Sequence, residues 1–597
     1  MPQKRSILDW IEYIGNKLPE PALLFALLSV LLILLSGILA PSLSKNSDGS
    51  TQQTGGWQVQ PVRLTVLTEE KIGADGKPEL DASGKPIRIP QLAESGKPLT
   101  KLEPNGDPIR VKSLMTSDGI YWMLSSMIRN FILFPPLGLV MTGMLGIGVA
   151  EKVGLFSALM RWLAGVTPKW MLTPMIILIG ANSSIASDAG YLILPPLAAA
   201  LYAAVGRHPL AGLSASFAGV AGGFGAGAFI TGADTILAGV ATTSAQILDP
   251  NESVLATANW YFKILSVPVL MLVGWFVTDR LVEPRLMRAC GGKLEIPTDA
   301  GVPTPGQFKL SSSEVRGLLL AGLGLVLVLG LLAFMMFKPG MPLAGDGQPS
   351  LPNGRLLVDV PAAAMKDGAT AKQISQPAAE KFGPRWTHVL VPAMFFAFLT
   401  PGLIYGFATR ALKSQADVVG ALFSAIKGIA PVIVLNFFAA QFLAYFSYSN
   451  LDRMLAFAGG EMLVKADLPV PLLLALFIAF IILADFAMSS MTAKFTLLAP
   501  ILIPMFMMVG VSPALAMAGY RIGDSVVNVV TPLNAYLGIV LLVLQRYQKS
   551  AGLGSLIALM VPYSITFGIM WTLFLLGWYM LGTNLGPDGP LHYIPPH

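Results

Sequence analysis

The feature that most constrains this chain is a series of uncharged apolar runs, each long enough to cross a lipid bilayer. A helix needs about 20 apolar residues to span the hydrocarbon core, and such runs lie at 22–40, 133–150, 317–337, 387–409 and 553–581. Only 12% of the 597 residues are charged and 54% are hydrophobic, whereas a soluble domain has about 25% charged residues. The sequence therefore predicts an all-α polytopic membrane protein.

Composition also excludes several classes of function. The single cysteine, Cys290, rules out an intramolecular disulfide and a cysteine metal cluster, and the four scattered histidines have no metal-ligand spacing. The glycines of GGFGAGAF (222–229) lack the Gly-Lys-Ser/Thr of a phosphate-binding loop, which argues against an ATP-driven pump. We expect no cofactor, no metal centre and no nucleic-acid partner.

Lysine and arginine placement predicts the topology, because these residues mark the cytoplasmic ends of membrane helices. Basic residues gather before the first run (Lys4, Arg5, Lys17), throughout 280–316, after 409 (Arg410, Lys413) and before 550 (Arg546, Lys549). The tail after Gly582 has none. We expect a cytoplasmic N-terminus, a periplasmic C-terminus and about nine transmembrane helices. The first run is expected to be a retained helix rather than a cleaved signal peptide.

Two polar segments, 42–115 and 338–384, interrupt the apolar pattern. Both are rich in glycine, proline and charged residues, and pieces such as WQVQPVRLTVL (57–67) alternate as β-hairpin strands do. We divide the N-terminal half into a cytoplasmic segment with the first transmembrane helix (1–41), a periplasmic insert (42–115) and a first repeat (116–279) with a hairpin near 181–205. A cytoplasmic linker (280–316), a transmembrane helix (317–337) and a second periplasmic insert (338–384) follow. The chain ends with a second repeat (385–582), which has a hairpin near 484–510, and a periplasmic tail (583–597).

The division into repeats depends on two distant segments with a shared pattern. GANSSIASDAGYLILPP (180–196) and ADFAMSSMTAKFTLLAPILIP (484–504) each combine a Ser-Ser pair, an apolar run and proline. Each is followed by another interrupted apolar segment, AGVAGGFGAGAFITGADT (218–235) and GYRIGDSVVNVVTPLN (519–534). Broken hydrophobic segments at corresponding places in two halves indicate a secondary transporter. The sequence therefore predicts two re-entrant hairpins and two broken helices in inverted repeats.

The last of these segments carries charge into the membrane. Arg521 and Asp524 lie one helical turn apart and Asn528 follows four residues later, although a charge at mid-membrane costs about 2.5–3.5 kcal/mol. The two charged residues could satisfy one another. Pro532 cannot continue the helix, and the backbone groups it frees are tolerated only in a cavity or inside protein. We interpret the stretch as a solute site; the alternative is a buried ion pair that fixes helix packing.

The two hairpins add further polar side chains. They are Asn182, Ser183, Ser184, Ser187 and Asp188 in the first, and Asp485, Ser489, Ser490, Thr492 and Lys494 in the second. Free N–H groups at half-helix ends suit an anionic or amide-bearing solute, although the serines could instead serve helix packing. Buried carboxylates can exchange protons, so Asp188, Asp485 and Asp524 are candidates for ion coupling, with Lys494 as a counter-ion. A candidate sodium site lies near Thr231, Asp234, Thr531 and Asn534.

These motifs resemble those of the p-aminobenzoyl-glutamate transporter (AbgT) family. The resemblance is carried by ILDWIEYIGNKLPEPALLFALL (7–28), SSIASDAGYLILPPLAAALYAAVGRHPLAGLSASFAGVAGGF (183–224), TAKFTLLAPILIPM (492–505) and GYRIGDSVVNVVTPL (519–533). It implies a homodimer whose subunits hold the substrate site between hairpins and broken helices. It also implies that Asp188, Thr492, Phe495, Arg521, Asp524 and Pro532 line that site.

The resemblance implies a function in a bacterial inner membrane: uptake of p-aminobenzoyl-glutamate, or proton-driven export of sulfonamide antimetabolites. Arg521 suits the glutamate carboxylates by bidentate hydrogen bonding. The chain departs from the family pattern at Asp485, where asparagine is usual, and at Phe495, where tryptophan is usual. Two alternatives stay open: sodium-coupled transport of another dipeptide-like or dicarboxylate anion, and a membrane-embedded hydrolase with Ser183 or Ser489 as nucleophile.

Overall fold

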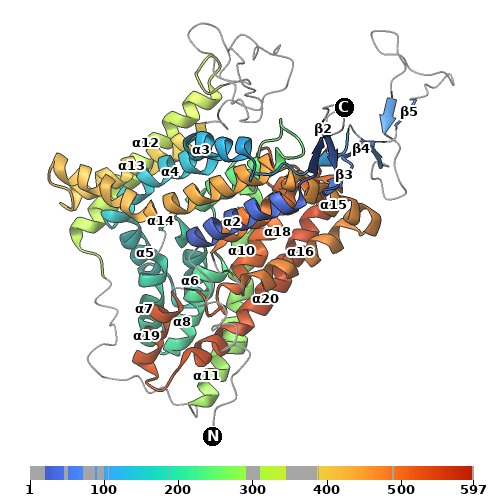
Figure 1. The fold of residues 1–597 in the computed structure, drawn as a ribbon. Helices are drawn as coiled ribbons and strands as arrows, with labels where there is room; N and C mark the ends of the chain where they lie inside the picture. Colours follow the sequence, from blue (N-terminus) through green and yellow to red (C-terminus); the bar gives the residue numbers. More distant parts are fainter. Residues whose placement is uncertain are drawn as a thin grey trace, which may run out of the picture.

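The structure, a computed structural model, is built of long helices (Figure 1). It describes residues 21–594 except 46–50, 67, 71–87, 91–99, 105–106, 187–188, 291–308, 345–385, 387–388, 487, 489 and 535. The described part has seven helices long and apolar enough to cross a membrane, or up to nine if each of two bent pairs forms one span. The expected polytopic helical membrane protein is confirmed.

The helices of the N-terminal half include both bent pairs. They are α2 (Pro21–Leu39), α3 (Ser117–Ile132), α4 (Pro135–Lys152), α5 (Leu155–Gly165), α6 (Leu172–Asn182), α7 (Ala189–Ala204), α8 (Pro209–Phe217), α9 (Gly232–Ala245), α10 (Trp260–Phe276) and α11 (Glu283–Ala289). The chain bends by 50° between Ser117–Gly138 and Met141–Lys152, and by 120° between Leu155–Gly165 and Lys169–Asn182. The second bend turns α6 back into the helical body.

The helices of the C-terminal half are longer on average than those of the N-terminal half, and four of them, α12, α14, α17 and α18, begin at a residue whose side chain caps the helix. They are α12 (Ser312–Phe337), α13 (Leu390–Ala408), α14 (Gln415–Tyr448), α15 (Leu451–Ala466), α16 (Val470–Asp485), α17 (Met491–Met508), α18 (Pro513–Val527), α19 (Leu537–Tyr547) and α20 (Leu553–Leu581). At the start of α12, Ser311 and Glu314 bond each other's backbone N–H groups as a capping box. Ser414 and Asp417 do the same for α14.

Close backbone contact through small residues holds one group of helices together. Helix α4 packs against α13 and α14, and α13 packs against α12. Gly146 of α4 faces the backbone of Phe395 in α13, and Gly402 of α13 faces the backbone of Ala150 in α4. Small residues at helix interfaces allow such approach in membranes, where dispersion contacts replace the hydrophobic effect.

A second group of helices shows matching packing in the two halves of the chain. Helix α10 packs against α6 as α20 does against α16, and α9 packs against α17 and α18 as α19 does against α7 and α8. Each half thus contributes the short helix after its break to the other half. The sequence predicts the hairpins at 181–205 and 484–510. These ranges hold the breaks and the second helices, α7 and α17, but only the last two residues of the first helices, α6 and α16.

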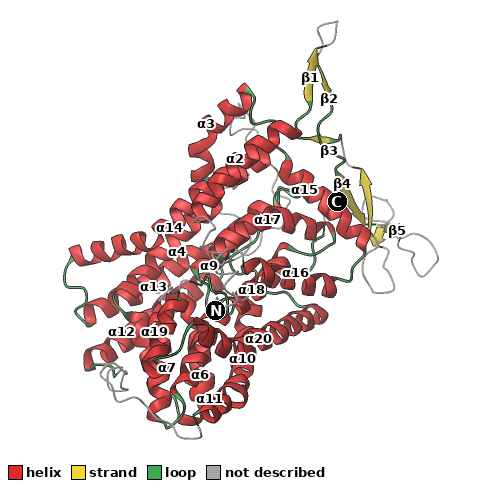
Figure 2. Cartoon of the chain, turned by 60° about the horizontal axis from the view of Figure 1, so that its bottom comes forward, coloured by secondary structure: helices red, strands yellow, loops and turns green. Residues whose placement is uncertain are grey.

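The insert at 42–115 forms paired strands, in agreement with its alternating sequence. The strands are β1 (Ser42–Lys45), β2 (Thr51–Thr54), β3 (Gln58–Val59), β4 (Val62–Val66), β5 (Thr68–Glu70), β6 (Arg88–Pro90), β7 (Thr100–Pro104) and β8 (Ile109–Arg110). They pair antiparallel as β1–β2, β3–β8, β4–β7 and β5–β6. Figure 2 shows them at one end of the helical body, near the C-terminus. Most of the second insert, 345–384, lies outside the described residues.

The tail after α20 folds back over the ends of the helices. Leu585 accepts a hydrogen bond from the backbone of Phe262 (2.9 Å), and Leu591 accepts one from Ser512 (3.2 Å). The Tyr593 hydroxyl donates to Asp249 at 3.1 Å. The tail therefore ties the starts of α10 and α18 to the loop after α9.

We predict that Gly146→Ala lowers stability by about 1–3 kcal/mol, as overpacking does. A Cβ at Gly146 would lie 2.4 Å from the Phe395 carbonyl oxygen, a backbone atom that cannot rotate away. Gly322→Ala in α12 is the control, since nothing lies within 4 Å of its Cβ position, and alanine there should be neutral or stabilising by about 0.5–1 kcal/mol. Thermal unfolding in detergent measures both; equal melting temperatures would contradict the close α4–α13 contact.

Candidate transport site

Helix α18 lies at the centre of the second group of helices, which consists of α6 to α10 and α16 to α20, and it has no exposed side. Every residue from Pro513 to Val527 is buried. The helix begins where the Ser512 hydroxyl accepts from the Leu515 N–H, with proline in the first turn. A helix buried on all sides can hold charge only where its neighbours supply partners.

Asp524 of α18 belongs to an acidic cluster with Asp485 and Lys494. The Lys494 ammonium forms ion pairs with Asp524 Oδ1 (2.9 Å) and with Asp485 Oδ1. All three side chains are 2% exposed or less. Two carboxylates share one ammonium, so the acidic cluster carries a net charge of −1 when both are ionised. Asp485 Oδ2 has no hydrogen-bond partner among the described residues.

Arg521 belongs to a different group, a basic cluster with Asp234 of α9 and Lys263 of α10. Arg521 Nη2 lies 2.7 Å from Asp234 Oδ1, and Lys263 Nζ lies 2.5 Å from Asp234 Oδ2. Arg521 Nε donates to Asn259 Oδ1 at 3.2 Å. Two cations share one carboxylate, so the basic cluster carries a net charge of +1. Its charged side chains are at most 4% exposed.

The sequence left open whether Arg521 and Asp524 satisfy one another, and their ion pairs show that each has a different partner. They lie on one helix face, but Arg521 pairs with α9 and Asp524 pairs with α17. Each charge has an ion-pair partner on a neighbouring helix, Lys494 at 2.9 Å from Asp524 and Asp234 at 2.7 Å from Arg521. The pair is therefore divided between two clusters of opposite net charge. The backbone positions of Arg521 and Asp524 differ by a rise of about 4.5 Å along α18, that is, three residues.

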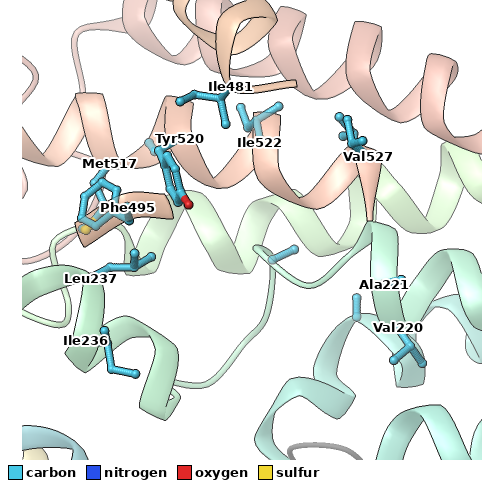
Figure 3. Close-up of a cluster of buried hydrophobic side chains, with 14 of the residues drawn as sticks. Val220, Ala221, Ile236, Leu237, Ile481, Phe495, Met517, Tyr520, Ile522 and Val527 are labelled. Carbon is cyan, nitrogen blue, oxygen red and sulfur yellow. The ribbon is translucent and has the colours of Figure 1, made fainter. Parts of the chain in front are cut away.

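An aromatic pair lies beside the acidic cluster, since the Tyr520 hydroxyl is 3.4 Å from Asp524 Oδ1. The rings of Phe495 and Tyr520 lie 4.6 Å apart, and the Tyr520 hydroxyl donates to the Met491 carbonyl at 2.6 Å. Figure 3 shows Phe495 beside Tyr520 and Met517, with Leu237 of α9 facing them. A small apolar pocket here is lined in part by Phe495 and Tyr520.

The segment between α8 and α9 brings the first hairpin to the same region. Helix α8 ends in a π-helical turn (Ala218–Gly222), after which the backbone leaves helical geometry. Asn182 Oδ1 accepts from the Ala228 N–H at 2.8 Å. The Ser525 hydroxyl of α18 accepts from the Gly225 N–H, also at 2.8 Å. The break thus contacts both α6 and α18.

The other expected hairpin residues have varied surroundings. Ser183 is buried and donates to the Gly180 carbonyl at 2.6 Å, a contact within its own turn, while Ser184 is partly exposed. Ser490 caps α17 through the Ala493 N–H. Thr492, in the first turn of α17, is partly exposed. Ser187, Asp188 and Ser489 lie outside the described residues.

The remaining expected residues lie in the second break or next to it. Asn528 Nδ2 lies 3.5 Å from Asp524 Oδ2, and Asn534 Nδ2 donates to the Asn528 carbonyl at 2.7 Å. Pro532 occupies the turn after α18. Thr531 is buried, and its hydroxyl has no partner among the described residues.

The candidate sodium residues have other roles in this arrangement. Thr231 and Asp234 form the capping box of α9, and the Lys263 ammonium occupies the space beside Asp234 Oδ2. The Lys263 ammonium would compete with a sodium ion for the Asp234 carboxylate. Sequence reasoning missed Lys263 and Asn259; the available signal was a lysine inside the apolar sequence WYFKILSVPVL of α10.

We predict that Lys494→Met lowers stability by about 3–5 kcal/mol, because it leaves two buried carboxylates without their cation. The loss should shrink at lower pH, where protonation neutralises the stranded carboxylates. The surface variant Lys465→Met is the control, since its pair with Glu461 is exposed and worth about 0–1 kcal/mol.

Thermal unfolding in detergent measures these variants. Adding Asp485→Asn and Asp524→Asn to Lys494→Met should recover most of the loss, because the cluster is then uncharged. Lys494→Met melting at the same temperature as the parent would show that the ammonium does not compensate the acidic cluster.

Comparison with known proteins identifies the family of this chain. The model of the AbgT transporter family matches residues 91–365 and 368–593. The p-aminobenzoyl-glutamate transport protein of Escherichia coli K12 is 32% identical over 98% of this chain and 97% of its own. The Alcanivorax borkumensis YdaH transporter matches with a TM-score of 0.74 and 30% identity, over 95% of this chain and all of that one.

A second solved structure is Neisseria gonorrhoeae MtrF, described within a class of antimetabolite efflux pumps. It matches with a TM-score of 0.76 and 32% identity, over 98% of this chain and all of that one. The family assignment excludes the hydrolase alternative, because the match spans almost the whole chain and the family consists of transporters. This chain is a multi-pass membrane transporter that belongs to the AbgT family.

Proposed function

We propose that the chain is an ion-coupled secondary transporter of a bacterial inner membrane. Its solutes would be aromatic amide anions of the p-aminobenzoyl-glutamate type, sulfonamide-type antimetabolites, or both. The observation that carries the proposal is the division of Arg521 and Asp524 between two buried clusters of opposite charge, beside two interrupted helices. The E. coli relative named for p-aminobenzoyl-glutamate transport and the efflux class of MtrF support the two solute types.

We propose a proton as the coupling ion and the acidic cluster as its binding place. Two carboxylates around one ammonium keep one excess negative charge in a site with almost no exposure. Binding one proton makes the cluster neutral and removes the free-energy cost of burying an uncompensated charge. Sodium coupling through Asp234 has less support, because the Lys263 ammonium already neutralises that carboxylate. Asp188 remains a further candidate for coupling.

We propose inverted repeats with two re-entrant hairpins, α6–α7 and α16–α17. Lys169 precedes α6 and Arg207 follows α7, which supports an opening toward the cytoplasm. Val511, after α17, pairs with His592 of the tail. The tail lacks lysine and arginine, which supports an opening of α16–α17 toward the periplasm. As the family resemblance implies, the working unit would be a homodimer.

Transport assays in liposomes test the solute site. We predict that Asp524→Asn and Arg521→Gln abolish counterflow of p-aminobenzoyl-glutamate and of a sulfonamide, because each removes one charge from a cluster on α18. Both variants should still insert, since α18 keeps its apolar surroundings; detergent-solubilised yield and gel filtration check this. Parent-like counterflow in either variant would exclude α18 as the solute site.

The coupling proposal gives a separate prediction for Asp485→Asn. The acidic cluster of this variant, with one carboxylate and one ammonium, is neutral without a proton. We expect solute binding to be retained and the dependence of transport on pH to flatten between acidic and neutral conditions. The measurement is the initial transport rate as a function of pH in proteoliposomes. A pH profile identical to that of the parent would remove Asp485 from the coupling role.

A further inference from the structure

We propose that Lys263 and Arg521 form a carboxylate-binding subsite and that Asp234 occupies this subsite when no solute is bound. The inference rests on the proposed transport of an anionic solute and assigns the groups that receive its negative charge. Asp234 then acts as an internal substitute for the solute carboxylate, and the solute enters by displacing it.

The first support is the excess of positive charge and hydrogen-bond donors in the basic cluster. Two buried cations face one carboxylate. A guanidinium has five N–H donors, yet Arg521 makes one aligned hydrogen bond, from Nε to Asn259, within the described structure. Arg521 Nη2 lies near Asp234 Oδ1, but neither atom has an aligned hydrogen bond in the described part. A second carboxylate would complete the donor set by the bidentate geometry that arginine favours.

Lys263 also has capacity for a further acceptor. Its ammonium contacts Asp234 Oδ2 at 2.5 Å and the Phe229 carbonyl at 3.1 Å, while an ammonium carries three N–H donors. Lys263 and Arg521 come from different helices and approach opposite oxygens of the same carboxylate. The two cations are thus placed to bind the two oxygens of one carboxylate group, which in this structure belongs to Asp234.

Asp234 has other partners that would hold it after displacement. Its Oδ2 accepts from the Thr231 N–H at 2.7 Å and from the Thr231 hydroxyl at 2.9 Å. It lies in the first turn of α9, where free N–H groups and the helix dipole favour a negative charge. Asp234 therefore keeps two hydrogen-bond donors, both from Thr231, when it gives up its two cations.

The surroundings provide a route to the subsite. Phe229, whose carbonyl contacts Lys263, lies in the non-helical segment between α8 and α9, and 48% of it is exposed. The residue whose carbonyl accepts from Lys263 is thus itself accessible from the surface. Gly227 has a φ of +150°, a conformation that glycine adopts readily. Rearrangement of this segment would open the basic cluster without unwinding α9 or α10.

Equilibrium binding in detergent tests the subsite with two probes, p-aminobenzoyl-glutamate and its uncharged dimethyl ester. We expect Lys263→Gln to weaken binding of the acid about tenfold or more, as loss of a hydrogen bond to a charged group does, and to leave the ester unchanged. We expect Asp234→Asn to bind the acid more tightly than the parent, because the competing carboxylate is gone. Lys427→Gln, an exposed lysine of α14, is the matched control and should match the parent.

The outcomes separate this inference from the proposed function. Weaker acid binding in Asp234→Asn, or equal effects of Lys263→Gln on acid and ester, would overturn the subsite while leaving the transport site intact. If Asp234→Asn does not fold, the acid-against-ester comparison in Lys263→Gln still decides. A parent protein that binds neither probe would contradict the proposed solute class, and the subsite with it.

Discussion

The organisation of this transporter depends on the cost of placing charge inside α18, a helix buried on every side. Removing one partner from a buried ion pair costs about 3–5 kcal/mol, so each charge on α18 needs a fixed partner on a neighbour. Asp234 and Lys263 compensate Arg521, and Lys494 compensates Asp524. These contacts join α9, α10 and α17 around α18. The two halves of the chain are therefore held together electrostatically at the same place where their helices are interrupted.

Neither cluster is neutral alone, although their net charges, +1 and −1, cancel. Under the proposals above, a solute carboxylate at the basic cluster would remove its excess charge and leave the neighbouring acidic cluster unbalanced. That imbalance favours proton uptake by the acidic cluster. By linkage, proton binding would then favour solute binding by the same factor. Two oppositely charged clusters on one helix thus offer a physical basis for coupling, without a long pathway between separate sites.

Sequence reasoning reached the helices, the breaks and the charged residues of α18, because hydropathy and helix-breaking residues act locally. It also offered Lys494 as a counter-ion for one of the hairpin carboxylates, and the structure pairs it with Asp485 across one short break. It did not find that Arg521 pairs with Asp234, a contact between distant parts of the chain that only packing determines. Lys263 was missed for the same reason, because no residue near it in sequence indicates which carboxylate it pairs with. Asp234 looked like a sodium ligand because its cationic partners were not visible locally.

An experimental structure of the protein with p-aminobenzoyl-glutamate bound would test most directly whether the basic cluster receives the solute carboxylate. We predict the solute between α18 and the break before α9, with a carboxylate held by Arg521 and Lys263 and with Asp234 bonded only to Thr231 at the start of α9. A solute bound elsewhere, with Asp234 still paired to both cations, would contradict the central claim.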